Sequence, residues 1–138
     1  MATRLDDITG FLNVDLDVYA KFNLRPLAAA FGKNVVILYA GREIDLYSTH
    51  LELARQPKNA DTAIRDFAAL INGLPRAKRK LWDTATIRDF NIGVQSKGKT
   101  KPHEIKLTTR TMKAVSSLNA RVVVTVYAAD RLRSGKAQ

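Results

Sequence analysis

Residues 11–20, FLNVDLDVYA, alternate apolar and polar side chains with a period of two. The apolar side chains on one side are Leu12, Val14, Leu16 and Val18. The polar side chains on the other are Asn13, Asp15 and Asp17. A period of two is typical of a strand that buries one face and leaves the other in water. This segment therefore predicts a half-buried strand.

Five further segments predict strands, because each alternates or is rich in β-branched residues: 34–40, 44–53, 87–95, 103–107 and 121–128. The continuous apolar run at 34–40 is typical of a buried central strand. Residues 103–107 are expected to pair with 87–95 as a hairpin, with residues 96–102 as the solvated tip.

Helices are expected at 23–32, 61–74, 75–85 and 108–119. Gly32 provides a stop for the first helix, and Thr108 is a possible N-cap for the last. The helix at 61–74 carries an amphipathic pattern at positions i, i+3, i+4 and i+7, formed by Ile64, Phe67, Ala68 and Ile71.

This order of elements predicts an α+β fold in one domain. About six strands would form a mixed or antiparallel sheet, with three or four helices mainly on one face. The chain of 138 residues is long enough for a single core. We expect an N-terminal extension at 1–10, the domain at 11–128, and a basic flexible tail at 129–138.

Composition and the N-terminal sequence predict a cytoplasmic protein. The chain has no cysteine, so disulfide frameworks, thiol nucleophiles and cysteine zinc sites are excluded. Its first residues do not resemble a signal peptide, and no apolar run approaches the roughly 20 residues that span a bilayer. No cofactor is expected.

The net charge of +10 is concentrated in the second half of the chain. Residues 1–75 contain 8 Lys/Arg against 9 Asp/Glu, whereas residues 76–138 contain 15 against 4. Such asymmetry favours an anionic macromolecule as partner, either nucleic acid or an acidic protein. The alternative is that the basic surface only aids solubility.

Two basic clusters are candidates for anion binding. One lies in the helix at 75–85 and consists of Arg76, Lys78, Arg79 and Lys80, and the other lies in the predicted tip and consists of Lys97, Lys99 and Lys101. Trp82 could stack on a base, although a lone tryptophan more often anchors a short helix to the core.

The segment GVQSKGKT, residues 93–100, fits the letters of a phosphate-binding loop, G-x-x-x-x-G-K-[ST]. Such a loop must lead into a helix whose N-terminus faces the phosphates. Here a strand is expected to follow, so a solvated hairpin tip is the favoured interpretation.

Polar side chains at alternate positions of three predicted strands form the other candidate site. They are Asn13, Asp15 and Asp17 on the first strand, Ser48, His50 and Glu52 on another, and Asp89, Asn91 and Gln95 on a third. If these strands adjoin, the polar face could hold a divalent cation or support acid–base chemistry. The weak metal candidates are Asp15, Asp17, His50 and Glu52. The alternative is an ordinary solvent face, and no catalytic residue is assigned.

Three segments together resemble a known group of proteins: FLNVDLDVYA at 11–20, FNIGVQ at 90–95, and IKLTTRTMKAVSSLNARVVVTVYA at 105–128. The chain resembles small uncharacterised bacterial proteins, and is similar to domain-of-unknown-function families of the DUF4279 type. The resemblance implies an α+β fold over about residues 11–128 and carries no catalytic residue.

The leading hypothesis is a non-catalytic binding protein whose basic C-terminal half engages nucleic acid or an acidic protein. The second is a bacterial or mobile-element protein-interaction module, immunity or inhibitor-like, that uses a sheet face or edge. The third is a small metal-binding or hydrolytic domain on the acidic face. The sequence leaves the oligomeric state open.

Overall fold

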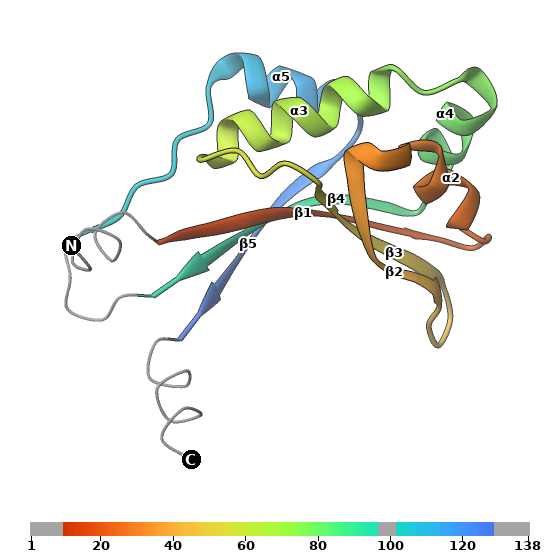
Figure 1. Ribbon diagram of the computed structural model, residues 1–138, viewed down its shortest axis with the longest axis horizontal. Coiled ribbons are helices and arrows are strands. Elements are labelled where there is room, and N and C mark those ends of the chain that lie inside the picture. Colours follow the sequence, from red (N-terminus) through yellow and green to blue (C-terminus); the bar gives the residue numbers. More distant parts are fainter. Residues whose placement is uncertain (1–9, 97–101, 129–138) are drawn as a thin grey trace.

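The computed structural model describes residues 10–96 and 102–128, which form an α+β fold with five strands and four α-helices (Figure 1). The strands are β1 (Phe11–Ala20), β2 (Val35–Arg42), β3 (Tyr47–Leu53), β4 (Ile87–Gln95) and β5 (Arg121–Tyr127). The helices are α2 (Arg25–Ala30), α3 (Ala60–Asn72), α4 (Arg76–Asp83) and α5 (Thr109–Ser117), with a 3₁₀ turn, η1 (Gly32–Asn34), after α2. The predicted extension and tail, residues 1–9 and 129–138, lie outside the described residues.

All five strands belong to one mixed sheet, in the order β2-β3-β1-β4-β5. The first four pair antiparallel, whereas β5 pairs parallel to β4. A parallel neighbour needs a crossover connection, which α5 provides between β4 and β5. β1 lies at the centre of the sheet.

The core lies between the sheet and the helices that cover it in Figure 1. On β1 the alternating side chains Val14, Leu16, Val18 and Ala20 are almost completely buried. The predicted apolar stripe of α3 packs against this face, and the ring of Phe67 lies 6.0 Å from that of Phe90 on β4. The periodicity of α3 therefore predicted its buried face correctly, and that of β1 did so from Val14 onward. Leu12, which was expected on the same face, is 49% exposed and lies at the register shift between Phe11 and Asn13.

Specific caps set the ends of the longer helices. Asn59 accepts a hydrogen bond from the backbone N–H of Thr62 at 2.8 Å at the start of α3. The predicted cap of α5 is confirmed, because the Thr108 hydroxyl accepts from the N–H of Thr111 at 3.2 Å. At the other end of α5, Asn119 adopts a φ of 54°, and the paired bonds that follow are those of a Schellman motif.

The predicted sixth strand, 103–107, does not form. Within the described residues this segment has no strand assignment, and β5 occupies the edge of β4 with which it was expected to pair. Its apolar side chains Ile105 and Leu107 pack against the core instead. The alternation of apolar residues in this segment therefore reflects packing without sheet pairing.

The prediction that 34–40 is a buried central strand is also wrong. β2 lies at the edge of the sheet, and Val36, Ile37, Leu38 and Tyr39 are 42–50% exposed. A register irregularity between Ile37 and Tyr39 interrupts its pairing with β3. A continuous apolar run does not tell a central strand from an apolar edge strand.

None of the helices in the described ranges is both long and apolar enough to cross a membrane.

Candidate functional site

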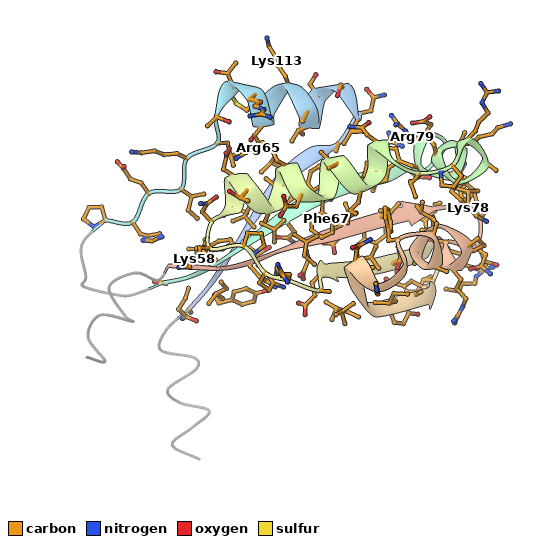
Figure 2. All side chains as sticks on the ribbon, turned by 45° about the horizontal axis from the view of Figure 1, so that its top comes forward. Lys58, Arg65, Phe67, Lys78, Arg79 and Lys113 are labelled. Carbon is orange, nitrogen blue, oxygen red and sulfur yellow. The ribbon has the colours of Figure 1, made fainter. Side chains whose placement is uncertain are left out.

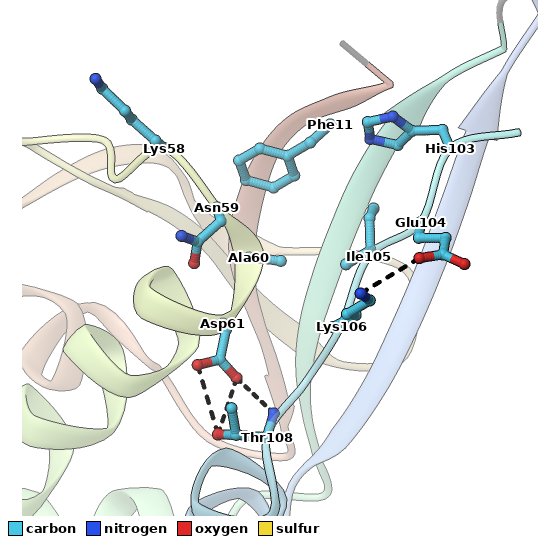
Figure 3. Close-up of a pocket in the computed structure, with 10 residues that line it drawn as sticks. All are labelled: Phe11, Lys58, Asn59, Ala60, Asp61, His103, Glu104, Ile105, Lys106 and Thr108. Carbon is cyan, nitrogen blue, oxygen red and sulfur yellow. Dashed lines mark hydrogen bonds and ion pairs between the residues drawn. The ribbon is translucent and has the colours of Figure 1, made fainter. Parts of the chain in front are cut away.

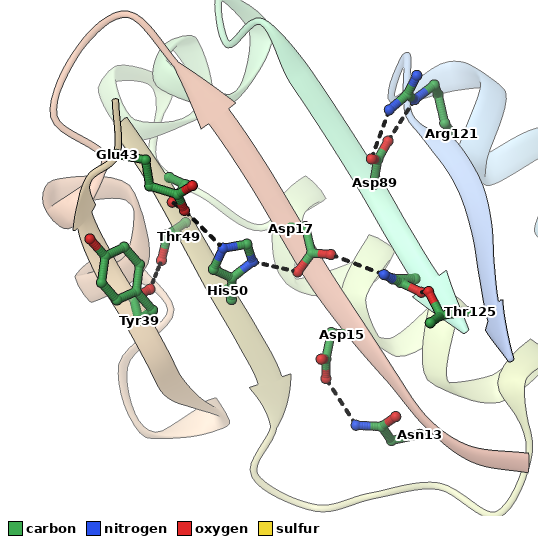
Figure 4. Close-up of polar contacts among 12 residues, drawn as sticks. Asn13, Asp15, Asp17, Tyr39, Glu43, Thr49, His50, Asp89, Arg121 and Thr125 are labelled. Carbon is green, nitrogen blue, oxygen red and sulfur yellow. Dashed lines mark hydrogen bonds and ion pairs between the residues drawn. The ribbon is translucent and has the colours of Figure 1, made fainter. Parts of the chain in front are cut away.

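The face of the sheet turned away from the helices, here called the open face, brings together the four acidic and histidine candidates Asp15, Asp17, His50 and Glu52. Figure 4 shows the first three of them. β1 and β3 are neighbours, and their register places Asp15 opposite Glu52 and Asp17 opposite His50. β4 adjoins β1 on the other side, with Asn91 opposite Asp15 and Asp89 opposite Asp17. The three polar strand faces therefore adjoin, as the hypothesis of a polar site required.

His50 lies between two carboxylates. Its Nδ1 is 2.8 Å from Oδ1 of Asp17, and its Nε2 is 3.6 Å from Oε2 of Glu43. The ring of Tyr19 meets the imidazole edge-on at 5.7 Å between centroids. Sequence reasoning missed Glu43, because it lies in the turn after β2 and no local pattern links it to His50.

The polar contacts continue from Asp17 across the sheet. Its Oδ2 accepts from Asn91 at 3.3 Å, and the Asn91 side-chain oxygen accepts from the Thr125 hydroxyl at 2.8 Å. Asp89 accepts two hydrogen bonds from the guanidinium of Arg121, at 2.7 and 2.9 Å. Four adjacent strands therefore share one network of side-chain hydrogen bonds.

Asp15 has the most perturbed carboxyl group on this face. Burial, followed by the nearby charges of Asp17 and Glu52, raises its pKa to about 6, and His50 opposes this shift. Asn13 donates to Oδ1 of Asp15 at 3.0 Å. Asp15 therefore takes up a proton in a pH range where exposed aspartates are ionised.

Glu43 and Ser48 form a separate contact at the border of the face. The Ser48 hydroxyl donates to Oε2 of Glu43 at 2.5 Å, and this bond lowers the pKa of Glu43. Ser48 is fully buried and does not bond to His50. It therefore offers no exposed nucleophile for the hydrolytic alternative.

The same geometry does not assemble a metal site. Across residues 10–96 and 102–128, no group of three or more His, Asp or Glu side chains is arranged to hold a metal ion. The Nδ1 atom of His50 already bonds to Asp17, and Asn13 bonds to Asp15.

The first basic cluster lies on α4, at one end of the sheet. Arg76 and Lys80 are exposed, whereas Lys78 and Arg79 are partly covered. Arg79 bonds to Asp83 at 3.1 Å and to the side chain of Asn72 at 3.2 Å. Trp82 is fully buried and donates to the backbone oxygen of Leu118 at 3.1 Å, so it anchors the helix to the core.

The second cluster, Lys97, Lys99 and Lys101, lies outside the described residues. Ser96, the last described residue before it, follows the end of β4 that is farthest from α4. A nine-residue strand spans about 27 Å, so Ser96 lies about that far from the end of β4 that follows α4. Residues 102–108 are not helical, which does not fit a phosphate-binding loop.

Further basic residues lie on or beside the other helices, as Figure 2 shows for Arg65 on α3, Lys113 on α5 and Lys58, which precedes α3. On α5, Arg110 and Lys113 are both exposed. Their spacing of i and i+3 places them on one side of the helix, away from the buried Val115. The i, i+3 spacing of Arg110 and Lys113 could have identified this basic pair in the sequence.

A hollow of about 430 Å³ lies where the segment 103–108 passes the start of α3 (Figure 3). Asp61 accepts from the backbone N–H of Thr108 at 2.8 Å and from its hydroxyl at 3.2 Å. Lys106 pairs with Glu104 at 3.4 Å. The contacts of Thr108 with Asp61 fasten the segment to α3, so we interpret the hollow as structural.

Comparison with known proteins found no matching family model, no matching curated protein and no matching solved structure. The similarity to DUF4279-type proteins therefore stays a prediction.

Proposed function

We propose that the protein binds the phosphate backbone of duplex nucleic acid through its helical layer, defined as α2, α3, α4 and α5. The proposal rests on the net positive charge of this helical layer. These four helices contain eight Lys/Arg against three Asp/Glu. Two of the three acidic residues, Asp61 and Asp83, already pair with arginines of their own helices, and the layer as a whole stays positive.

The distribution of aromatic residues favours a duplex over a single strand. Proteins that bind single strands usually stack bases on exposed aromatic side chains. The helical layer contains two aromatic residues, Phe67 and Trp82, and both are fully buried. Contacts from lysine and arginine to phosphates need no such platform and do not read the sequence.

The two faces of the molecule carry opposite charge, which supports a single orientation on the nucleic acid. Asp15, Asp17 and Glu52 lie on the open face, where they would repel phosphates. A polyanion is therefore steered toward the helices.

The test compares two charge reversals of equal size. Arg76→Glu with Lys80→Glu changes exposed residues of the helical layer, and Arg42→Glu with Arg55→Glu changes exposed residues outside it. We expect the first pair to weaken binding to a short DNA duplex about tenfold or more, and the control pair to weaken it much less. Equal losses would assign the binding to net charge alone.

A third variant, in which Lys97, Lys99 and Lys101 become glutamate, tests the other cluster. Loss of binding in this variant alone would move the interface from the helices to residues 97–101 and contradict the proposal. Retained binding would support the helical layer.

A second candidate is a protein-interaction module that uses β5, because this edge strand is strongly apolar. Val122, Val124, Val126 and Tyr127 are 37–62% exposed, and β5 has a partner on one side only. An edge of this kind can accept a strand from another protein. Substitution of Val124 by lysine should abolish that interaction without changing the affinity for DNA.

A further inference from the structure

The two edge strands of the sheet, β2 and β5, differ in how regular an edge they present (Figure 1). β2 has a register irregularity between Ile37 and Tyr39, and a bulge of this kind turns an edge strand away from further partners. β5 pairs with β4 over seven residues without a register shift, and its sequence contains no proline or glycine. Its one charged residue, Arg121, stands at the first position and pairs with Asp89. Among the described strands, β5 is therefore the edge to which another strand can add.

The side chains of β5 that face the helices are all valines. Val122, Val124 and Val126 lie beside the apolar residues of β4 in the parallel register. They are 37%, 57% and 62% exposed, and they form one side of an apolar groove of about 290 Å³ next to the segment 103–107. A strand added to β5 would cover this valine row.

The sequence of β5 is complementary to itself when two copies run antiparallel. A two-fold axis through Val124 pairs all seven residues, and each residue then lies opposite the one at the same distance on the other side of position 124. Val124 meets its own copy, and Val122 meets Val126 of the second copy. Every residue of the valine row is thus opposite a valine, the kind of cross-strand pair that stabilises a sheet.

The same register avoids opposing like charges. Arg121 falls opposite Tyr127 of the second copy, where a guanidinium can lie against an aromatic ring. On the same face, Val123 falls opposite Thr125, and both are β-branched residues that favour strands. Both faces of the paired strands are therefore compatible with a second copy of the chain.

We propose that two copies of the protein associate through antiparallel pairing of their β5 strands, so that the five strands of each copy join in one continuous sheet. This inference rests on the second candidate function above, because it names the partner of the β5 edge. It is independent of the binding of nucleic acid.

The size and charge of the contact indicate a weak dimer. Seven residues from each copy are fewer than the roughly 20–30 residues per side of a standard interface, so we expect a Kd of about 10–100 µM. Each copy carries a net charge of +10, and salt screens the repulsion between the two copies. Self-association should therefore strengthen as the salt concentration rises, whereas the binding of a DNA duplex should weaken.

Sedimentation velocity of the full chain from about 1 to 300 µM, in about 0.5 M NaCl, measures the association. We expect a concentration-dependent shift from monomer to dimer in the wild type. Val124→Lys, which opposes two like charges at the centre of the contact, should weaken the dimer about tenfold or more. Val36→Lys is the matched control, because Val36 is an exposed valine on the other edge strand, and it should leave the Kd close to that of the wild type.

Cross-linking tests the register and does not depend on how well the lysine variant folds. The chain has no cysteine, so Val124→Cys introduces a single thiol that lies opposite its own copy, within the roughly 7 Å that a disulfide allows between Cα atoms. In the control Val122→Cys, the two thiols are four residues apart along the strands, or about 13 Å. Mild oxidation should yield a disulfide-linked dimer of the first variant and much less of the second.

Disulfide formation at position 124 in clear preference to position 122, together with a dimer that Val124→Lys weakens, would support the proposal. A wild type that stays monomeric up to about 300 µM would overturn it. Equal losses in Val124→Lys and Val36→Lys, or equal cross-linking at positions 124 and 122, would also overturn it. These outcomes are distinguishable from a failure of duplex binding, because no nucleic acid is present.

Discussion

The imidazole of His50 and the carboxylate of Asp17 face each other on neighbouring strands, with Nδ1 2.8 Å from Oδ1. Asp17 is 9% exposed, so the loss of His50 leaves a nearly buried carboxylate with one side-chain partner fewer. We expect the His50→Ala and Asp17→Ala substitutions to be coupled by about 1 kcal/mol or more in a double-mutant cycle. Urea unfolding of the four proteins measures this coupling, and strictly additive losses would contradict it.

The raised pKa of Asp15 makes the stability of the protein depend on pH. Its pKa is raised from 3.8 to about 6 in the folded protein, so the folded state binds the proton more tightly than the unfolded state. Proton binding to Asp15 contributes to the free energy of unfolding at low pH, and this contribution is lost as the pH rises from about 4 to above 6. Asp15→Asn should therefore stabilise the protein at pH 8, by about 1 kcal/mol once partial exposure is allowed for, and have no such effect near pH 3.

The measurement is the melting temperature of wild type and Asp15→Asn at both pH values, in about 0.5 M NaCl to screen exposed charges near Asp15. Burial of Asp15 is the largest cause of its raised pKa, and salt does not screen this effect. An equal change in melting temperature at pH 3 and pH 8 would rule out the titration of Asp15 as its cause.

Gly93 is required by the packing of the open face. A Cβ at this position would lie 2.7 Å from the side-chain oxygen of Asn13, which would have to turn away from Asp15. We expect Gly93→Ala to cost about 1 kcal/mol. Gly73→Ala is the control, because its nearest contact would be 3.4 Å, and thermal unfolding should show little change or a small gain. Equal effects would contradict this interpretation.

Thr108 joins α5 to α3. Its hydroxyl accepts from the N–H of Thr111 as an N-cap and also contacts Asp61 at 3.2 Å. We expect Thr108→Ala to destabilise the protein by about 1 kcal/mol and Thr108→Ser to restore most of the loss. The neighbouring Thr109→Ala, at an exposed position, should cost clearly less in urea unfolding. Similar losses at 108 and 109 would argue against the cap.

Regular hydrophobic periods allowed the central elements to be predicted. β1 and α3 each repeat an apolar pattern along the element, and both bury the expected side chains except Leu12 at the start of β1. The segments at 34–40 and 103–107 were assigned wrongly, because an apolar run does not encode which edge of the sheet it occupies. β5 takes the place expected for 103–107 by pairing parallel to β4 through a long connection, which local sequence does not predict.

The candidate site was predictable to the extent that it depends on strand faces. The open face carries Asp15, Asp17, His50 and Glu52, because alternate residues of a strand point to the same side of the sheet. The contact of Glu43 with His50 depends on the turn between β2 and β3, and the pair formed by Asp89 and Arg121 depends on β5 lying beside β4. These are tertiary relationships between distant residues, so no local pattern could reveal them.

The salt dependence of duplex DNA binding tests the central claim most directly. Fluorescence polarisation of a labelled duplex at several salt concentrations gives the slope of log K against log[salt], which reports how many phosphates the protein neutralises. We predict a slope of about −3 to −5 for the wild type, and a slope shallower by about 2 for the protein with Arg76→Glu and Lys80→Glu. Binding that is independent of salt, or an unchanged slope in that variant, would contradict recognition through the helical layer.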